Sequence, residues 1–247
     1  TIRGSYGEGY FAPTPFVEEI EAAGLSRLLP VEGLKEEQAQ TASLDVTYRF
    51  DDIETSFTLF GSNVDNVTRL EAVDSSDGTP STNVRLVNAQ GESKIRGSEV
   101  LLRYYWEDLK LTASYLYLDA TEEVPDASGR RKLALTPQHS AGFVAMWEQH
   151  GKFMVGFEAY YTGVQRVDDN PYITHTKPYW HLGLLGQITT GRYSWFLNLE
   201  NLLDVQQTDE HPLLLQSQTP SGRWTTDIWS RNDGFIANAG VRIKFGG

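Results

Sequence analysis

The chain has 247 residues and a formal net charge of -12, and it contains no cysteine. The lack of cysteine excludes disulfides and thiolate metal sites. The acidic balance argues against a nucleic-acid partner, because binding nucleic acid requires a basic surface. No stretch approaches the ~18 consecutive apolar residues of a transmembrane helix. The mean hydropathy of -0.39 is also too low for a helical membrane protein, but it suits strands that alternate apolar and polar residues.

The first residues, Thr1 to Ser5, have the character of a strand interior and not of a signal peptide. We therefore expect the chain to begin partway through a fold. The following segment, Thr14 to Leu28, is the one place with helical periodicity. Its apolar residues have the spacing of one short amphipathic face; they are Phe16, Val17, Ile20, Leu25 and Leu28.

Elsewhere the apolar residues recur with period two. In 43–50, for example, Leu44, Val46, Tyr48 and Phe50 alternate with polar residues. This alternation indicates a strand with one apolar and one polar face. About ten segments show it, and several exceed the five or six residues usual for soluble strands. The expected strands are Ile2–Gly7, Gln38–Phe50, Ile53–Arg69, Asn83–Trp106, Leu109–Ala120, Gln138–Gln149, Lys152–Gly163, Pro178–Thr190, Tyr193–Leu203 and Gly234–Phe245.

The connections between these strands alternate between very short and long. The short ones are Asp51-Asp52, Glu107-Asp108, His150-Gly151 and Gly191-Arg192. The long ones are Glu8–Glu37, Leu70–Thr82, Thr121–Pro137, Val164–Lys177 and Asp204–Asp233. Tight turns at one end and long loops at the other are typical of a membrane barrel, with periplasmic turns and extracellular loops. A soluble β-sandwich, the rival fold, mixes its loop lengths at both ends.

Aromatic residues recur close to the short turns, as in the girdle of a membrane–water interface. They are Tyr48, Phe50, Trp106, Trp147, Phe153, Tyr193, Trp195 and Phe245. Charged residues fall on the opposite faces of the strands, where a barrel has its wet interior. These are Arg49, Glu99, Arg103, Lys110, Glu158, Glu200, Arg242 and Lys244. Periodicity alone does not separate a sandwich from a barrel, whereas the loop asymmetry favours the barrel.

Five segments, in chain order, resemble the barrel of TonB-dependent outer-membrane receptors. The most specific is Asn198–Asp204, NLENLLD, which is similar to the family's NLxNLxD strand near the C-terminus. Leu34–Gln38 resembles the family's LKPE segment, with Glu36 in place of the proline. The others are Arg3–Thr14, similar to a strand that ends in GxGFxAPT, Gly97-Ser98-Glu99 with Ala113–Ala120, and Gly240–Phe245, which resembles the terminal assembly signal.

The resemblance implies an all-β fold, an antiparallel transmembrane β-barrel of about 22 strands. Residues 1-247 would form about ten C-terminal strands of it, without the N-terminal plug domain and the early strands. Ten strands alone would leave two open edges that lipid does not tolerate. One departure is that Gly246-Gly247 follow Phe245, whereas the family's barrel normally ends on the aromatic residue.

The function that this resemblance implies is energised import of a scarce nutrient across the outer membrane of a Gram-negative bacterium. The leading cargo is a ferric siderophore or a related metal chelate. The implied partners are lipid and lipopolysaccharide around the barrel, the TonB complex acting through the plug, the small nutrient itself, and the barrel assembly machinery, which would read the terminal strand ending at Phe245. No nucleic acid is expected. A passive porin-like barrel and a structural barrel are the alternatives.

Ligand contacts are expected in the long loops, because binding residues concentrate on loops held by a rigid scaffold. Aromatic side chains there can stack on a flat chelate: Tyr10, Phe11, Tyr172, Trp224 and Trp229. Cationic side chains can pair with an anionic ferric complex: Arg166, Lys177, Arg223 and Arg231. The alternative for each residue is that it only packs the loops against one another.

No enzymatic site is expected, and neither is a cofactor or a metal site. The histidines lack the spacing of a metal-binding motif; they are His139, His150, His175, His181 and His211. The paired acids Asp51-Asp52 and Asp168-Asp169 are interpreted as turn residues. A barrel protease or lipase would require a nucleophile, an acid and a base grouped on one face, and no such set is evident.

Overall fold

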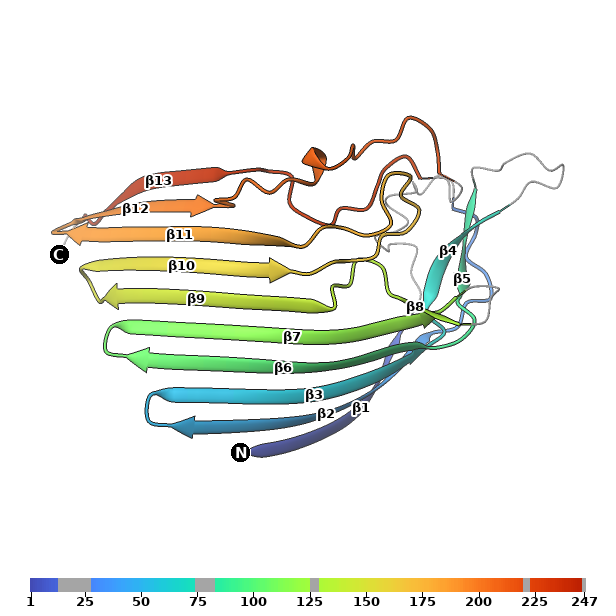
Figure 1. Cartoon of the computed structure of the whole chain (residues 1–247), viewed down its shortest axis with the longest axis horizontal. Helices are drawn as coiled ribbons and strands as arrows, with labels where there is room; N and C mark the ends of the chain where they lie inside the picture. The colour runs from blue at the N-terminus through green and yellow to red at the C-terminus, as the bar shows by residue number, and fades with distance from the viewer. Residues whose placement is uncertain (13–27, 74–82, 125–128, 220–222, 246–247) are drawn as a thin grey trace.

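The computed structural model describes residues 1–12, 28–73, 83–124, 129–219 and 223–245. Ten antiparallel strands form one sheet in the order β1-β2-β3-β6-β7-β9-β10-β11-β12-β13, and the short β8 pairs with β7 (Figure 1). The ten strands are β1 (Ile2–Phe11), β2 (Glu37–Phe50), β3 (Ile53–Asp65), β6 (Ser93–Trp106), β7 (Leu109–Glu123), β9 (His139–Gln149), β10 (Phe153–Thr162), β11 (Tyr179–Thr190), β12 (Tyr193–Glu200) and β13 (Ile236–Ile243). The expected antiparallel all-β fold is confirmed.

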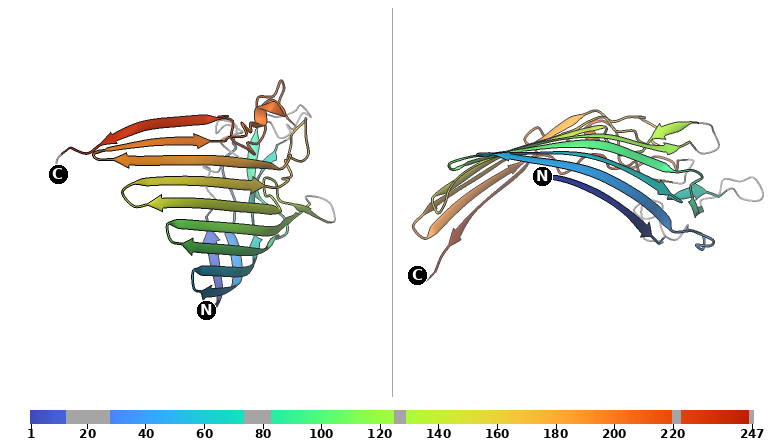
Figure 2. Two further views of the ribbon diagram at one scale, coloured as in Figure 1. Left: turned by 60° about the vertical axis from the view of Figure 1, so that its left-hand side comes forward. Right: turned by 90° about the horizontal axis from the view of Figure 1, so that it is seen from below.

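The sheet curves into an open arc (Figure 2). The short turns lie at one end of the arc, and the long connections lie at the other (Figure 1). A separate hairpin, β4 (Thr68–Ala72) with β5 (Val84–Asn88), projects at the loop end, as does β8 (Arg130–Lys132). The one helix, in the described part of the chain, is the 3-10 turn η2 (Gln207–Asp209). Nothing helical in these ranges is long and apolar enough to cross a membrane.

The strand registers gather the alternating residues into two continuous faces. Across β2, β3, β6 and β7 the partners Val46, Phe57, Val100 and Tyr115 form an apolar row. The rows on the opposite side of the sheet contain polar residues, among them Arg49, which pairs with Glu54 in the next strand. We call the two sides of the sheet the apolar face and the polar face. In the described part of the chain, no protein layer covers the apolar face, and its side chains are largely exposed, Trp147 by 52% and Ile188 by 56%.

All eight aromatic residues that the sequence places near the short turns belong to the apolar face by register and alternation. Trp147 and Phe153 pack edge to face there, with ring centroids 4.9 Å apart. A second row of aromatic residues crosses the same face, closer to the long loops. The sequence pattern did not predict this row. In this row Tyr161 lies 5.1 Å from Trp180, and Tyr117 lies 5.5 Å from His139.

The two aromatic rows bound a band of apolar residues. Eight positions along the strand separate Trp147 from His139 in β9, and the same interval separates Phe153 from Tyr161 in β10. With a rise of ~3.3 Å per residue and a tilt of ~40°, eight positions span roughly 20 Å along the membrane normal. This height is close to the ~25 Å apolar band of outer-membrane barrels. The geometry of the apolar face therefore fits a lipid bilayer.

Two expected strands are each interrupted in the structure. The strand expected at Ile53–Arg69 ends at Asp65, because Asn66 adopts a left-handed backbone with φ 57°. The strand expected at Asn83–Trp106 breaks at 89–92, where Gly91 has φ 89° and an added Cβ would lie 2.0 Å from the Glu123 carboxylate. The outer pieces pair with each other as β4 and β5 instead of extending the sheet. Between the long strands β7 and β9, the expected loop also contains β8.

The segment expected to be helical, Thr14–Leu28, lies outside the described residues except for its last member. Leu28 forms a parallel bridge with Val84 of the β4–β5 hairpin, and the Leu29 amide donates to the Val84 carbonyl at 2.9 Å. Val84 is almost fully buried beneath this contact. The C-terminal end of the first long connection is thus hydrogen-bonded to the β4–β5 hairpin, which belongs to the second long connection.

Candidate ligand-binding site

Two long connections, 163–178 and 201–235, pack together at the loop end of the sheet. Gln207 lies at the centre of the second connection and its side chain is 0% exposed. Its amide nitrogen donates to the Asp227 carbonyl at 2.6 Å, and its amide oxygen accepts from the Trp229 backbone N–H at 2.9 Å. Because buried polar groups are costly unless they are hydrogen-bonded, these bonds fix the two branches of 201–235 against each other.

Aromatic rings join that loop to its neighbour. The imidazole of His211 stacks on Tyr172 with ring centroids 5.8 Å apart, and its Nε2 accepts from the Trp229 indole N–H at 3.3 Å. The hydroxyl of Tyr179, at the start of β11, donates to the Trp229 carbonyl at 2.8 Å. Trp229 is only 7% exposed in this cluster. The structure therefore places Trp229, one of the expected ligand contacts, inside the loop packing.

Arg166 forms a second centre, where 163–178 meets β7 and β8. Its guanidinium donates to both carboxylate oxygens of Asp168 and, at 3.2 Å, to Glu122. It also donates to the Lys132 carbonyl at 2.5 Å, and its side chain is 15% exposed. Arg131 shares the Glu122 carboxylate at 2.7 Å. Arg166 is thus saturated by partners within the protein.

The other expected cations are also paired with carboxylates. Lys177 lies 2.7 Å from Glu210, and Arg231 lies 3.4 Å from Glu200. Arg223 is bound to Asp227, with both side chains largely buried. At the β5–β6 connection, the hydrogen bond from Lys94 lowers the pKa of the Glu92 carboxyl below its ordinary value, so this carboxylate stays charged. The loop end is a network of ion pairs.

The remaining expected contacts have accessible rings. Tyr172 and Trp224 are each about half exposed in the two packed loops. Tyr10 and Phe11 end β1, and the strand alternation places them on opposite faces: Tyr10 shares the face of Ile2, and Phe11 shares the face of Arg3. The structure thus brings Tyr172, Trp229 and the paired cations into one loop assembly, whereas Tyr10 and Phe11 belong to a separate edge strand.

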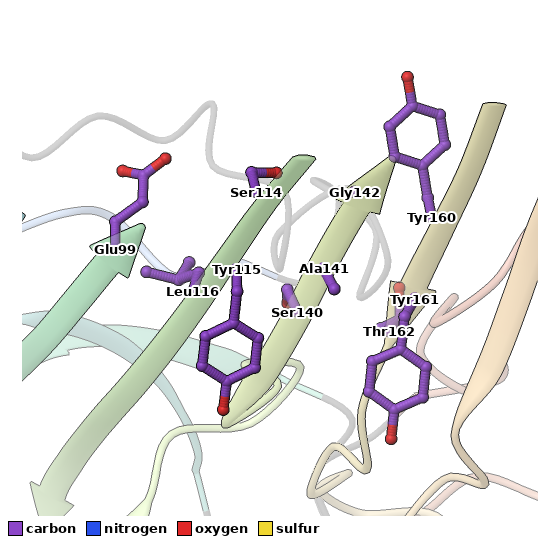
Figure 3. A pocket seen from close by; sticks show the side chains of 10 residues that line it. All are labelled: Glu99, Ser114, Tyr115, Leu116, Ser140, Ala141, Gly142, Tyr160, Tyr161 and Thr162. Carbon is purple, nitrogen blue, oxygen red and sulfur yellow. The ribbon is translucent and has the colours of Figure 1, made fainter. Parts of the chain in front are cut away.

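A shallow hollow of about 360 Å³ lies in the wall formed by β6, β7, β9 and β10. Figure 3 shows that Glu99, Ser114 and Tyr160 leave the sheet on one side, while the rings of Tyr115 and Tyr161 leave it on the other. Gly142 has no side chain, and an added Cβ would lie 3.0 Å from the Ser114 hydroxyl. The hollow on the polar face is therefore lined by small and hydroxyl-bearing residues, with Glu99 as its charged group.

A second hollow of about 410 Å³ is formed by the loop residues 170–175. The Asn170 carboxamide oxygen accepts from the backbone N–H groups of Tyr172 and Ile173, at 2.9 and 3.2 Å, and so holds the turn that presents the Tyr172 ring. In the described ranges, no group of three or more His, Asp or Glu side chains is arranged to hold a metal ion. The accessible features of this end include aromatic rings, hydroxyls, carboxylates and the side chains of Lys177 and Arg231.

The residues that organise these loops cannot be recognised from the sequence pattern. Gln207 carries a polar side chain in a polar segment, and nothing in its spacing indicates burial. His211 stands in no recognisable motif, and the structure shows it buried between the rings of Tyr172 and Trp229. Tyr172, His211 and Trp229 are far apart in the sequence, and their proximity can be recognised only once the loops are known to meet.

Comparison with known proteins identifies the family. A family model described as "TonB dependent receptor-like, beta-barrel" matches residues 1–202, which is most of the chain. The chain belongs to the TonB-dependent receptor family. The barrels of this family lie in the outer membrane of Gram-negative bacteria, and the apolar face bounded by two aromatic rows agrees with that location. No curated protein matches the chain by sequence.

Solved TonB-dependent receptors share the fold at low sequence identity. The ferric-catecholate import receptor Fiu from Escherichia coli K12 superposes with a TM-score of 0.63 at 16% identity, covering 99% of this chain and 33% of Fiu. The FrpB iron transporter from Neisseria meningitidis superposes with a TM-score of 0.65 at 12% identity, covering 97% of this chain and 36% of FrpB. The siderophore receptor PirA from Acinetobacter baumannii superposes with a TM-score of 0.66 at 16% identity, covering 99% of this chain and 39% of PirA. The chain thus spans between 33% and 39% of the length of these structures.

Proposed function

We propose that this chain is the C-terminal wall of a receptor that imports a scarce nutrient with energy from the inner membrane. The cargo that we propose is a ferric siderophore or a related metal chelate. The observation that carries the proposal is the family match over residues 1–202. Three similar structures are described as receptors or transporters for iron or siderophores, which supports iron chelates as the first cargo to test.

In this proposal the whole receptor is a barrel of about 22 strands that encloses a plug domain. The TonB complex acts through the plug, lipid and lipopolysaccharide surround the apolar face, and the assembly machinery reads the strand that ends at Phe245. The two edges of the open arc, β1 and β13, support a longer barrel, because unpaired strand edges are not tolerated in lipid.

The loop end supplies the proposed ligand contacts. Tyr172 and Trp224 present accessible rings for stacking, and Phe11 and Tyr10 offer two more at the end of β1. Arg231 remains a candidate because its side chain is 60% exposed despite its ion pair with Glu200. Arg166 and Trp229, which are enclosed by loop partners, act in this proposal by holding the loops that carry the contacts.

Calorimetric binding tests the proposal directly. The full-length receptor is titrated with a panel of ferric siderophores, haem and cobalamin. Tight binding of one member, with a Kd between roughly nanomolar and micromolar, is the expected result for a nutrient receptor. If no member binds, the metal-chelate cargo is contradicted, and a porin-like or structural role for the barrel gains support.

A further inference from the structure

The apolar face of β6 and β7 becomes charged just beyond the second aromatic row. Between the two aromatic rows, these two strands place only uncharged side chains on this face: Val100, Leu102 and Tyr104 in β6, and Leu111, Ala113 and Tyr115 in β7. The next cations outward on the same face are Arg96 and Lys94 in β6, joined by Lys132 and Arg130 of β8. Because the long connections face outward in a membrane barrel, these cations lie at the outer edge of the lipid-facing surface.

The strand register gives the depth of Arg96 relative to the aromatic row. Ser98 lies opposite Tyr117 of that row, and Arg96 lies opposite Asp119, two positions farther along both strands. With a rise of ~3.3 Å per residue and a tilt of ~40°, two positions correspond to roughly 5 Å along the membrane normal. The polar headgroups occupy roughly 5–8 Å on each side of the hydrocarbon core. Arg96 therefore lies at the depth of the headgroups.

The Arg96 side chain lies across β3 and is held there by uncharged acceptors. A Cβ added at Gly61, its partner in β3, would be 3.0 Å from Arg96 Cδ, so the arginine uses the space that the glycine leaves. Its Nη1 donates to the carbonyls of Ser62 and Ile95 at 2.8 and 2.7 Å, and its Nη2 donates to Asn63 Oδ1 at 2.7 Å. Three of the five guanidinium N–H groups are thus used, and two have no partner among the described residues.

The neighbouring cations have carboxylate partners, whereas Arg96 has none. The pairs are Lys132 with Asp119 at 2.5 Å, Lys94 with Glu92 at 2.5 Å, and Arg130 with Glu123 at 3.5 Å. In the described ranges, no carboxylate lies within 4.0 Å of Arg96. At the level nearest the lipid, Arg96 and the Lys132 ammonium group therefore face one carboxylate, that of Asp119. The other acids of this face, Glu92, Glu123 and Asp65, lie farther outward.

The short turns at the opposite end of these strands are acidic. The β2–β3 turn is Asp51-Asp52, and the β6–β7 turn is Glu107-Asp108. Carboxylates repel an anionic headgroup, whereas the cations beyond the second aromatic row attract one. The charge on this part of the wall therefore favours an anionic lipid in the outer leaflet.

We propose that Arg96, with Lys94 and Lys132 beside it, binds a phosphate group of a lipopolysaccharide molecule in the outer leaflet. Guanidinium and phosphate groups form strong, charge-assisted hydrogen bonds, and the two free N–H groups of Arg96 can supply them. The acyl chains of the same molecule would lie on the apolar band below, beside Val100 and Tyr115. This inference rests on the proposed function, which places lipopolysaccharide around the apolar face, and it names the residues that bind this partner.

The test measures lipid binding to the delipidated full-length receptor in detergent micelles by native mass spectrometry. The three probes are bisphosphorylated lipid A, the same lipid A without its phosphates, and phosphatidylglycerol. Bisphosphorylated lipid A is expected to bind more tightly than either of the others, on the order of tenfold. Equal binding of lipid A with and without phosphates would overturn the proposal. Binding of phosphatidylglycerol as tight as that of bisphosphorylated lipid A would overturn the assignment to lipopolysaccharide.

Matched variants assign the effect to Arg96. Arg96→Gln removes the charge and should lower the affinity for bisphosphorylated lipid A on the order of tenfold, to the level of the dephosphorylated lipid. Lys110→Gln is the control, because Lys110 is a cation of the polar face at the turn end of β7, 3.9 Å from Glu148. It should leave all three affinities unchanged, and an unchanged affinity in Arg96→Gln would contradict the proposal.

The test is independent of the cargo. Arg96 lies outside the loops that carry the proposed ligand contacts, so both variants should bind ferric chelates as the native receptor does. Loss of the lipid result with chelate binding intact would overturn this inference alone. Absence of chelate binding in the native receptor would contradict the proposed import function, whereas the lipid measurement would still decide the role of Arg96.

Discussion

At the scale of single residues, the polar face contains large rings placed over glycines. Phe60 lies across Gly97 of the neighbouring strand, and Phe196 lies across Gly240 in the same way. A Cβ added at Gly97 would be 2.3 Å from the Phe60 ring, and one at Gly240 would be 2.6 Å from the Phe196 ring. Each glycine therefore makes room for a ring that covers the strand pairing. These pairs explain how two phenyl rings fit on the polar face.

Replacing Gly97 by Ala tests this packing. The added methyl group forces the Phe60 ring from its position, and we expect a loss of roughly 1–3 kcal/mol in the free energy of unfolding. Gly186→Ala is the matched control, because no heavy atom lies within 4 Å of the added Cβ in the middle of β11. It should be neutral or slightly stabilising. Urea-induced unfolding of the full receptor in detergent micelles measures both, and equal stability of the two variants would contradict the account.

At the scale of elements, the period-two pattern of apolar residues predicts the ten strands of the sheet, because it extends over most of the length of each strand. It merged two of them with a separate hairpin. The break in β3 depends on a left-handed Asn66, and Asn tolerates that conformation without demanding it. The loop packing was also missed, since polarity suggests exposure, whereas Gln207 is fully buried by partners that lie about twenty positions away along the chain.

Gln207 gives the loop assembly its own test. Gln207→Ala leaves the Trp229 N–H and the Asp227 carbonyl buried without partners, which we expect to cost ~1–3 kcal/mol in local stability. Hydrogen exchange followed by mass spectrometry should accelerate in 163–178 and 201–235 and stay unchanged in β9–β12. Gln216→Ala, at an exposed position of the same loop, should alter neither region. Unchanged exchange in Gln207→Ala would show that the two loops are held by other contacts.

At the scale of the whole molecule, the sheet has one face for lipid and one for the barrel interior. Its aromatic rows lie about 20 Å apart by strand geometry, close to the ~25 Å apolar band of outer-membrane barrels. The registers that align the apolar rows also bring the long connections to one end, where paired charges and exposed rings form the outward surface. The fold class and family followed from alternation, loop asymmetry and motif order. The ligand contacts did not, because they depend on how the loops pack.

The most direct test of the account is the uptake of a radiolabelled ferric chelate by cells that depend on the full receptor. The chelate is one that the receptor binds in vitro, and uptake is followed with and without collapse of the proton gradient. We predict accumulation against the concentration gradient that stops when the proton gradient is collapsed and is absent from cells without the receptor. Uptake that only equilibrates the chelate and persists without the proton gradient would contradict energised import and indicate a passive pore.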